Sequence, residues 1–289
     1  MFTIFGATGN TGSVVASDLL AKGRKVRVVV RSADKAAALA ARGAEVAIGD
    51  VLDADSVARA LDGADGAYFL VPPDLSSTDL VGRGRRIVEG FLSALKRHPV
   101  KHAVVLSSVA AHEPAGTGPI VIVHDAEKRL VTSPGTAFTF VRAAYFMENL
   151  LAFAHPMKQD GVLPVFGGGE EIAFPMVATE DIGHVAAEAL AEGPRGQGAE
   201  IIELSGPKEY SFADAASLAG SILGKPVTAR ALPIEGLVPT MTGLGVSSNV
   251  ASLYEELTRG LGTGLVRFEE KGRAMRGKVA LERVLRSLS

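Results

Sequence analysis

Strand, turn and helix meet in Phe2-Thr3-Ile4-Phe5-Gly6-Ala7-Thr8-Gly9-Asn10-Thr11-Gly12, the stretch that decides the fold of this 289-residue chain. Gly6 permits a tight turn, Gly9 lets the backbone approach phosphates without an intervening Cβ, and Gly12 lets the next helix pack close to the strand. The helix that begins near Asn10 points its free N–H groups and the positive end of its dipole at the same place. The stretch therefore predicts a pyrophosphate-binding site.

The surrounding sequence supplies the context that such a glycine turn needs. A glycine triplet alone is a weak signal, and its spacing here is G-x-x-G-x-x-G rather than the commoner G-x-G-x-x-G. Apolar residues at helical spacing follow the glycines, Gly23 ends that helix, and Lys25 to Val30 is typical of a buried parallel strand. A glycine turn without a ligand is the alternative, but the context favours a dinucleotide. The predicted contacts in this turn are Gly6, Thr8, Gly9, Asn10, Thr11 and Gly12.

The tip of the second strand indicates which dinucleotide binds. At this place a site for NAD usually puts an acid on the ribose hydroxyls, whereas an arginine suits the 2′-phosphate of NADP. Here the tip reads Val30-Arg31-Ser32, and the first carboxylate is Asp34. The Arg31 guanidinium matches phosphate geometry, and the Ser32 hydroxyl adds a donor. A solvated Arg31 and a Ser32 that only caps a helix are the alternatives, but the ribose rule favours NADP.

Composition restricts the class of protein. Hydrophobic residues make up 47% of the chain and charged residues 21%, which is typical of a globular α/β protein. The net charge of −2 gives no electrostatic reason to expect nucleic acid or an anionic membrane as a partner. The chain has no cysteine and no H-E-x-x-H motif, so no metal site is expected. The first strand begins at Phe2 and leaves no room for a signal peptide, so we expect a soluble cytoplasmic protein.

Helices and strands alternate through the first half, and the strands are continuously apolar. This pattern predicts a parallel sheet covered on both faces, with ligands at the carboxyl ends of the strands. We therefore expect a doubly wound α/β fold of the Rossmann type. The expected helices are at about 33–42 (capped by Ser32), 54–61 (capped by Asp53), 78–97, 120–133, 180–192 (capped by Thr179) and from Ser211, with a capping box, to Gly224. The expected strands are 45–50, 66–71, 101–107 and 138–142.

After about residue 150 the predicted helices and strands become short, and glycine and proline interrupt them. We predict an NADP-binding domain over residues 1–152, to which residues 175–205 return. Residues 153–289 then form a smaller mixed α/β lobe on the substrate side.

Several segments together resemble the NmrA-like family of atypical short-chain dehydrogenases/reductases, and the resemblance covers essentially the whole chain. They are Gly6–Gly12, the Val30-Arg31-Ser32 tip, Gly49-Asp50, Phe140–Asn149 and Ala178–Ile182. The family includes NADPH-dependent quinone and dye reductases, and members that bind NADP as a redox sensor. The resemblance implies that Asp50 and Val51 lie near the adenine and that Leu70, Val71 and Pro72 lie along the dinucleotide.

Short-chain dehydrogenases generally resemble one another in having a Ser-Tyr-Lys set, with Tyr and Lys four residues apart on one helical face. The catalytic residues of this chain depart from that set. The tyrosines of this chain are Tyr68, Tyr145, Tyr210 and Tyr254, and none has a lysine four residues on. At the expected place, His124 and Lys128 have that spacing. We predict that Ser107 and Lys128 contact the cofactor, Lys128 at the nicotinamide ribose, and that His124 orients or protonates the substrate. An exposed helical face is the alternative.

The missing tyrosine bears on the reaction type. Ketone reduction generates an alkoxide, which needs strong acid assistance. Hydride addition to a quinone generates a phenolate-like oxygen, whose pKa is about 10, and needs little beyond orientation and a few donors. A substrate pocket is expected after the sixth strand, at Tyr145, Phe146 and Asn149, with ordinary core packing as the alternative.

These patterns predict an NADPH-dependent reductase that transfers hydride to a quinone or a similarly electron-poor small molecule. The second interpretation is an NADP-binding sensor that acts through a protein partner and catalyses nothing. A sugar or isoflavone-type reductase is disfavoured by the missing tyrosine. The expected partner is a small-molecule substrate, and a homodimer is left open.

Overall fold

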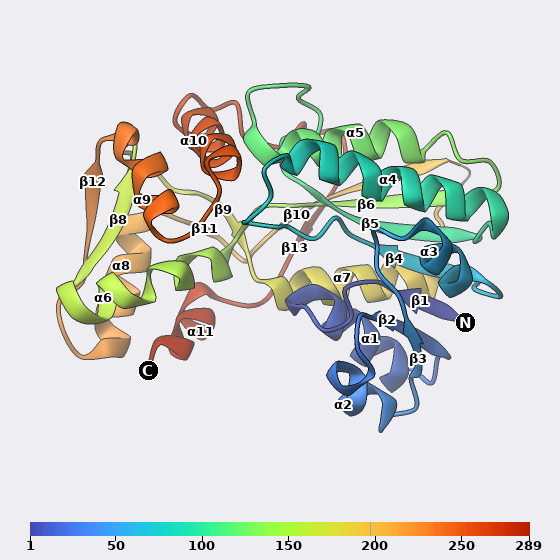
Figure 1. Ribbon diagram of the computed structural model, residues 1–289. Coiled ribbons are helices and arrows are strands. Elements are labelled where there is room, and N and C mark those ends of the chain that lie inside the picture. The colour runs from blue at the N-terminus through green and yellow to red at the C-terminus, as the bar shows by residue number, and fades with distance from the viewer. Residues whose placement is uncertain (197) are drawn as a thin grey trace.

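The central sheet contains eight strands in the computed structural model, which describes residues 1–196 and 198–289 (Figure 1). The strands are β1 (Phe2–Ile4), β2 (Val26–Val30), β3 (Glu45–Ile48), β4 (Gly66–Phe69), β5 (His102–Ser108), β6 (Ala137–Ala143), β10 (Ala199–Ser205) and β13 (Arg273–Arg276). Their order is β3-β2-β1-β4-β5-β6-β10-β13, and every neighbouring pair is parallel. The order reverses between β1 and β4, and ligands of such sheets bind at the carboxyl ends beside that reversal.

Helices cover both faces of this sheet (Figure 1). One face carries α1 (Asn10–Ala21) and α7 (Thr179–Glu192), and the other carries α3 (Ala54–Leu61), α4 (Leu80–Arg97) and α5 (Val121–Leu130). Val15, Leu19 and Ile182 are fully buried in the first of the two cores. In the second, the rings of Phe69 and Phe91 stack with their centroids 4.2 Å apart. The predicted doubly wound parallel fold is confirmed.

A smaller lobe follows β6, with a three-stranded sheet in the order β11-β9-β7 and a parallel pair of β8 and β12. Its strands are β7 (Tyr145–Phe146), β8 (Val162–Phe166), β9 (Phe174–Val177), β11 (Glu209–Tyr210) and β12 (Thr228–Leu232). The remaining helices are α2 (Ala37–Ala40), in the first half, and α6 (Ala154–Asp160), α8 (Phe212–Leu223), α9 (Leu237–Gly243), α10 (Ser248–Gly262) and α11 (Leu281–Leu285). The 3-10 turns are η1 (Ala33–Ala36), η2 (Gly118–Ile120), η3 (Met147–Phe153), η4 (Ile234–Gly236) and η5 (Arg286–Leu288).

The second half of the chain also contributes to the main sheet. β10 lies between β6 and β13, and α7 packs along α1 (Figure 1). From β13 the chain crosses to α11 in the smaller lobe. The crossing segment is fixed by Asp181, near the start of α7, whose carboxylate accepts from the N–H groups of Lys278 at 3.0 Å and Val279 at 2.9 Å. The predicted division at residue 152 stays a prediction.

Helix α10 packs on the loops that follow β4 and β5. At its start, Ser247 donates from its backbone N to the Leu75 carbonyl at 2.9 Å and from Oγ to the Ser77 carbonyl at 2.5 Å. The Asn249 amide oxygen accepts from the Leu80 N–H, the first of α4, at 2.9 Å. Further along, α10 packs against η2 in the loop after β5. These contacts bring α10 to the end of the sheet at which a ligand is expected.

Element boundaries agree with the sequence-based expectation to within a few residues, except after β2. The helix expected at 33–42 is the 3-10 turn η1 followed by the four-residue α2. Ser32 occupies the N-cap position, but its hydroxyl donates to the Asp34 carboxylate instead of accepting from a helix amide. The caps expected at Asp53 and at Ser211, with its capping box, are confirmed.

The expectation that Thr179 caps the helix at 180–192 is wrong. Thr179 is the first residue of α7, and Ala178 occupies the N-cap. The cap comes from Glu148, whose carboxylate accepts from the Thr179 N–H at 2.9 Å and the Thr179 hydroxyl at 2.6 Å. A carboxylate satisfies the free amide and the positive dipole end together, which a threonine hydroxyl cannot do.

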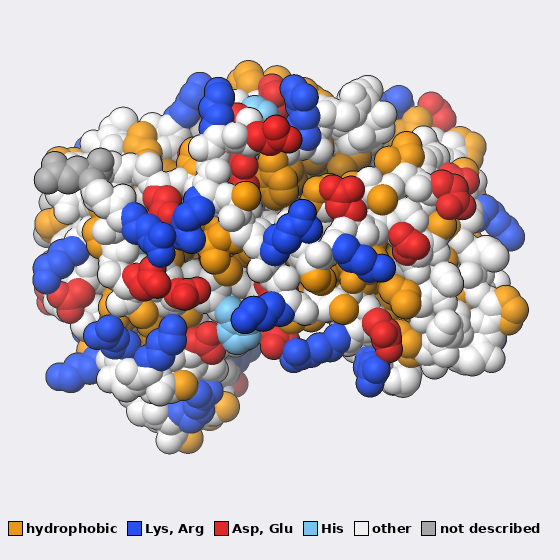
Figure 2. Space-filling view, turned by 180° about the vertical axis from the view of Figure 1, so that it is seen from behind, with side chains coloured by type: hydrophobic (Ala, Val, Ile, Leu, Met, Phe, Trp, Pro, Cys, Tyr) orange, Lys and Arg blue, Asp and Glu red, His pale blue; other side chains and the backbone are white. Residues whose placement is uncertain are grey.

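The surface mixes charges of both signs. On the face shown in Figure 2, Lys and Arg side chains are interspersed with Asp and Glu, in accord with the net charge of −2. Among the helices within 1–196 and 198–289, none has both the length and the apolar character that crossing a membrane requires.

Candidate cofactor and substrate site

Gly6 and Gly12 are required by the fold of the glycine turn itself. Gly6 has a φ of +64°, and a Cβ on it would lie 2.5 Å from Cδ2 of Leu70. A Cβ on Gly12 would overlap with the Gly6 carbonyl oxygen. Backbone conformation and close packing therefore explain both glycines without a ligand.

Gly9 is constrained less tightly within the protein than Gly6 and Gly12 are. Its φ of −90° is open to any residue, and a Cβ there would meet the Gly6 carbonyl oxygen at 3.3 Å. Gly9 is exposed and is the N-cap of α1, whose first intrahelical bond runs from the Ser13 N–H to the Gly9 carbonyl at 3.1 Å. The amides ahead of Ser13 are those that a helix start offers to an anion. The turn therefore leaves space where a phosphate could meet these amides.

The two threonines of the turn differ in their surroundings. Thr8 is exposed, next to Gly9. Thr11 is buried, and its Oγ1 accepts from the Tyr68 hydroxyl at 2.9 Å. Burial raises the pKa of Tyr68, so this phenol stays a neutral donor to Thr11. Thr11 therefore faces the core with its side chain and offers a ligand only its backbone.

The end of β2 presents one exposed cation. Arg31 is exposed, immediately before the half-buried Ser32. The Ser32 hydroxyl is engaged by the Asp34 carboxylate. Of the pair predicted for the 2′-phosphate, Arg31 is therefore the group that is free to turn toward it, and Ser32 would have to release Asp34 first.

The end of β3 is shaped by Asp50. Its Oδ1 accepts from the Leu52 N–H at 2.9 Å, which turns the chain at Val51 toward α3. Asp50 and Val51 are both half-buried. The carboxylate keeps acceptor capacity beyond that one bond, as a contact to an adenine would need.

The end of β4 lies against the glycine turn. Leu70 is the side chain that a Cβ on Gly6 would meet, so it covers the turn from one side. Val71 packs against the apolar clusters of α4 and α10. The Pro72 carbonyl accepts from Arg83 at 3.1 Å. The structure thus brings Leu70 beside the glycines, while the Pro72 carbonyl is already engaged by α4.

The residues predicted on α5 have different exposures. His124 is half-buried, and its Nδ1 donates to the Ala111 carbonyl at 2.8 Å. Lys128, one turn later, is exposed. Ser107, at the end of β5, is buried and donates from Oγ to a carboxylate oxygen of Glu127 at 2.5 Å. Because a hydroxyl has one hydrogen, Ser107 can only accept a bond from a ligand.

Sequence reasoning missed a buried ion pair in the same place. Arg142 on β6 donates to Glu127 from Nη2 at 2.7 Å and from Nε at 3.0 Å, and from Nη1 to Glu269 at 2.8 Å. The two carboxylates raise the pKa of Arg142 against the opposing effect of burial. Hydrogen bonds from Lys271 and Arg142 lower the pKa of Glu269 to about 2. An arginine within a continuous apolar strand is the signal that could have marked this cluster.

Aromatic rings surround the predicted substrate residues. The ring of Tyr145 stands edge-on to Phe174, with centroids 5.5 Å apart, and to Phe212, at 6.2 Å. The pKa of Tyr145 is raised, mainly by burial and also by the neighbouring Tyr254. A hydrogen bond with Asn149 opposes this rise only in part. Tyr145 is therefore a neutral donor near pH 7 and a weaker acid than free tyrosine. Phe146 is half-buried and Asn149 is exposed.

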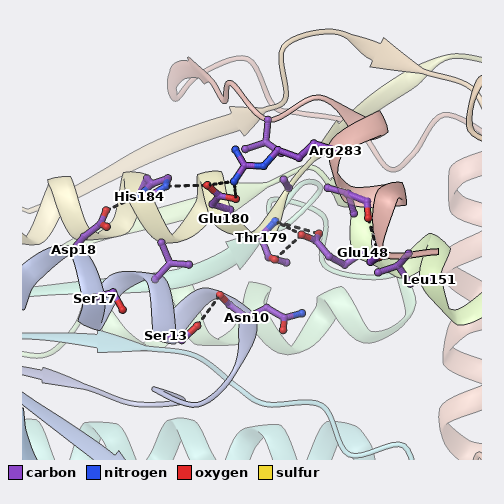
Figure 3. A pocket seen from close by; sticks show the side chains of 15 residues that line it. Asn10, Ser13, Ser17, Asp18, Glu148, Leu151, Thr179, Glu180, His184 and Arg283 are labelled. Atoms are coloured by element: carbon purple, nitrogen blue, oxygen red, sulfur yellow. Dashed lines mark hydrogen bonds and ion pairs between the residues drawn. The ribbon is translucent and has the colours of Figure 1, made fainter. Parts of the chain in front are cut away.

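A groove of about 740 Å³ opens elsewhere, between α1, η3, α7 and α11 (Figure 3). Asn10 lines one end of it, so the groove begins at the start of α1. Its charged walls pair with one another: His184 donates to Asp18 at 2.6 Å, and Arg283 donates to Glu180 at 2.7 Å. The hydrogen bond with Asp18 raises the pKa of His184. The groove runs along the helices on one face of the sheet and does not follow the carboxyl ends of β4 and β5. Among the described residues, no group of three or more histidine and acidic side chains is arranged to hold a metal.

The chain is similar in sequence and in fold to known proteins. Residues 1–260 match the model of the NmrA-like family. NAD(P)H azoreductase of Xenophilus azovorans is 29% identical over 259 residues, which cover 89% of this chain and 86% of that protein. Quinone oxidoreductase 2 of Escherichia coli is 25% identical over 268 residues, covering 91% and 89%. A crystal structure of an NADPH-dependent quinone oxidoreductase from Escherichia coli, complexed with NADPH, matches 100% of this chain and 99% of its own, with a TM-score of 0.81 and 24% identity. That likeness shows a common fold.

Proposed function

Because this chain belongs to the NmrA-like family, as its sequence predicted, we propose that it is an NADPH-dependent reductase that transfers hydride to a quinone or a similarly electron-poor small molecule. The observation that supports the proposal is Gly9, an exposed glycine at a helix start whose backbone conformation suits any residue and whose Cβ would crowd the Gly6 carbonyl oxygen without overlapping it. The similarity to an NAD(P)H azoreductase and a quinone oxidoreductase supports the choice of cofactor and acceptor.

Residues of this chain have the chemical character that several parts of NADPH require. The amides at the start of α1 suit the pyrophosphate, and the exposed Arg31 suits the 2′-phosphate. Leu70 beside the turn gives an apolar wall. Ser107, as an acceptor, suits an amide N–H such as that of the nicotinamide carboxamide.

The acid–base groups fit an acceptor that needs little proton assistance. When bound, NADPH supplies the hydride. Tyr145 has a raised pKa and serves as a neutral hydrogen-bond donor that orients an acceptor oxygen. His124 holds its Nδ1 proton on the Ala111 carbonyl, so Nε2 of the neutral ring accepts a proton and can return it only from the imidazolium. A quinone, whose reduced oxygen has a phenol-like pKa of about 10, is served by such weak donors.

The test is steady-state oxidation of NADPH with a panel of quinones and azo dyes. Turnover with at least one acceptor supports the reductase. Tight NADPH binding without any turnover would leave the sensor interpretation instead.

Arg31→Ala is expected to weaken NADPH binding by about 1.5–3 kcal/mol, the scale of a charged hydrogen bond, and to leave NADH nearly unchanged. The reason is that NADH lacks the 2′-phosphate. Titration of both cofactors measures the difference, with Arg86→Ala, another exposed arginine, as the control. Equal losses for the two cofactors would remove Arg31 from the 2′-phosphate site.

His124→Phe is expected to lower quinone turnover by less than about a hundredfold, the lower limit for an obligatory general acid. Lys128→Ala is expected to act through cofactor placement and to raise the apparent KM for NADPH. Steady-state kinetics of both variants with one quinone measures these effects. Complete loss of turnover in His124→Phe with intact NADPH binding would make His124 an obligatory acid, and two unchanged variants would place the pair on an inert surface.

A further inference from the structure

Glu127 is a buried acid on the helix that carries both predicted catalytic residues. It lies three residues after His124 and next to Lys128, and its side chain is 10% exposed. Its partner Arg142 is 5% exposed, and two hydrogen bonds join their side chains. Ser107 donates to the same carboxylate. Glu127 therefore ties α5 to the carboxyl ends of both β5 and β6.

Stability alone does not explain this pair. Removing two charges from water costs several kcal/mol per ion, and replacing a buried ion pair with apolar residues of similar volume is often neutral or stabilising. A charged tether does, however, fix position more narrowly than apolar packing, because each hydrogen bond requires a definite distance and angle. The geometry of α5 relative to the strand ends is what the pair restricts.

His124 is restrained from a second side by the loop after β5. Its Nδ1 bonds the Ala111 carbonyl at 2.8 Å. The preceding residue, Ala110, has a φ of +60°, a left-handed conformation that is unfavourable for a residue other than glycine and persists only when neighbours enforce it. One enforcing contact is the bond from the Ala110 N–H to the Arg267 carbonyl at 3.1 Å.

The two restraints meet in one segment of the chain. Arg267 holds the loop that bonds the imidazole, and Glu269, two residues later, accepts from Arg142 at 2.8 Å. Arg142 in turn holds Glu127 and with it the helix that carries His124. The imidazole is thus fixed through its own ring nitrogen and through its helix, and both restraints are anchored at residues 267–269.

From this closed circuit of contacts we infer that Glu127 is a positioning residue, which with Arg142 sets the orientation and tautomer of His124. The tautomer follows from the geometry. With Nδ1–H on a carbonyl, the neutral ring keeps Nε2 unprotonated, so Nε2 can donate only from the imidazolium. If α5 shifts, the Nδ1–H bond lengthens and the ring loses its preference. For its catalytic consequence the inference rests on the proposed reductase function.

The first test needs no activity. Long-range ¹H–¹⁵N spectra of the imidazole rings report which nitrogen carries the proton. We expect one tautomer for His124, with the proton on Nδ1, and a mixture of both in Glu127→Gln. The matched control is Asp125→Asn, which removes the same charge from the same helix but, among the described residues, from a carboxylate whose hydrogen-bonding partner is Arg129, at 3.3 Å. The control is expected to keep the single tautomer.

The second test is a double-mutant cycle on quinone turnover. Glu127→Gln is expected to lower kcat by no more than His124→Phe does, with little change in the KM for NADPH. Because Glu127 acts through His124, the double variant is expected to turn over at about the rate of His124→Phe alone. Independent residues would give effects that multiply.

A second variant keeps the inference testable if Glu127→Gln fails to fold. Glu127→Met combined with Arg142→Met removes both charges, and Glu269 keeps Lys271 as a partner at 2.8 Å. The same mixed tautomer is expected. An unchanged tautomer in the folded variant, or multiplying effects in the cycle, overturns the positioning role. If the wild-type protein reduces no acceptor, the proposed function fails, and the tautomer spectra still decide the role of Glu127.

Discussion

Gly9→Val abolishes binding of both NADPH and NADH, and the protein stays folded: this is the result we expect from the glycine turn. Among the described residues, the one atom near a Cβ at this position is the Gly6 carbonyl oxygen, at 3.3 Å, a tight contact but not an overlap, and the φ of −90° suits any residue. A branched side chain there would occupy the space that a pyrophosphate needs at the start of α1. Both dinucleotides share that pyrophosphate, so both lose affinity.

Cofactor titration and circular dichroism measure the two parts of this prediction. Gly12→Ala cannot replace Gly9→Val in the experiment, because its Cβ would overlap with the Gly6 carbonyl oxygen and would disturb the fold itself. The control is Gly262→Val, which adds the same side chain at an exposed glycine at the end of α10, where no neighbouring element of the described residues lies within 4 Å of the new Cβ. Affinity retained in Gly9→Val would place the cofactor elsewhere.

Arg142→Ala is expected to lower the free energy of unfolding by about 3–5 kcal/mol, because it leaves the buried Glu127 carboxylate without its cation. Urea denaturation followed by circular dichroism measures the loss. The matched control is Arg259→Ala. Arg259 also makes two hydrogen bonds to one carboxylate, that of Glu255, but its side chain is 54% exposed. That control is expected to cost at most about 1 kcal/mol.

The apolar double variant at positions 127 and 142 separates the two sources of this loss. If the large effect of Arg142→Ala comes from an unpaired buried charge, removal of both charges restores most of the stability. A loss in Arg142→Ala no larger than that of Arg259→Ala would show that water or Lys271 compensates Glu127 and Glu269, and the cluster would not be a tightly restrained unit.

Local features of the fold could be predicted because they depend on interactions between residues that are close in sequence. The strand and glycine turn at 2–12, the cap at Asp53 and the capping box at Ser211 each involve partners within a few positions. Thr179 shows where this reasoning fails. The cap of α7 comes from Glu148, 31 residues earlier, and a helix start in sequence does not reveal a carboxylate that folding brings to it.

In the candidate site, too, features set by neighbouring residues could be predicted and features set by distant residues could not. The glycines and Arg31 follow from spacing along one β-α-β unit, so the sequence alone marks them. The restraint on His124 depends on Arg267 and Glu269, more than 140 residues away, and on the register that pairs Ser107 with Arg142. Such pairings are set by tertiary packing and have no periodicity that a single sequence displays.

The strand order has a consequence for synthesis of the protein on the ribosome. Until residues 199–205 have emerged, β6 has a free edge, and the segment Phe138–Val141 carries two phenylalanines and a valine along it. β10 in turn pairs with residues 273–276, about 70 residues further along the chain. Pairings between such distant segments form slowly, and an unpaired apolar strand edge is a template for association with other chains. During synthesis, this strand edge is therefore a place at which the nascent chain can associate with other chains.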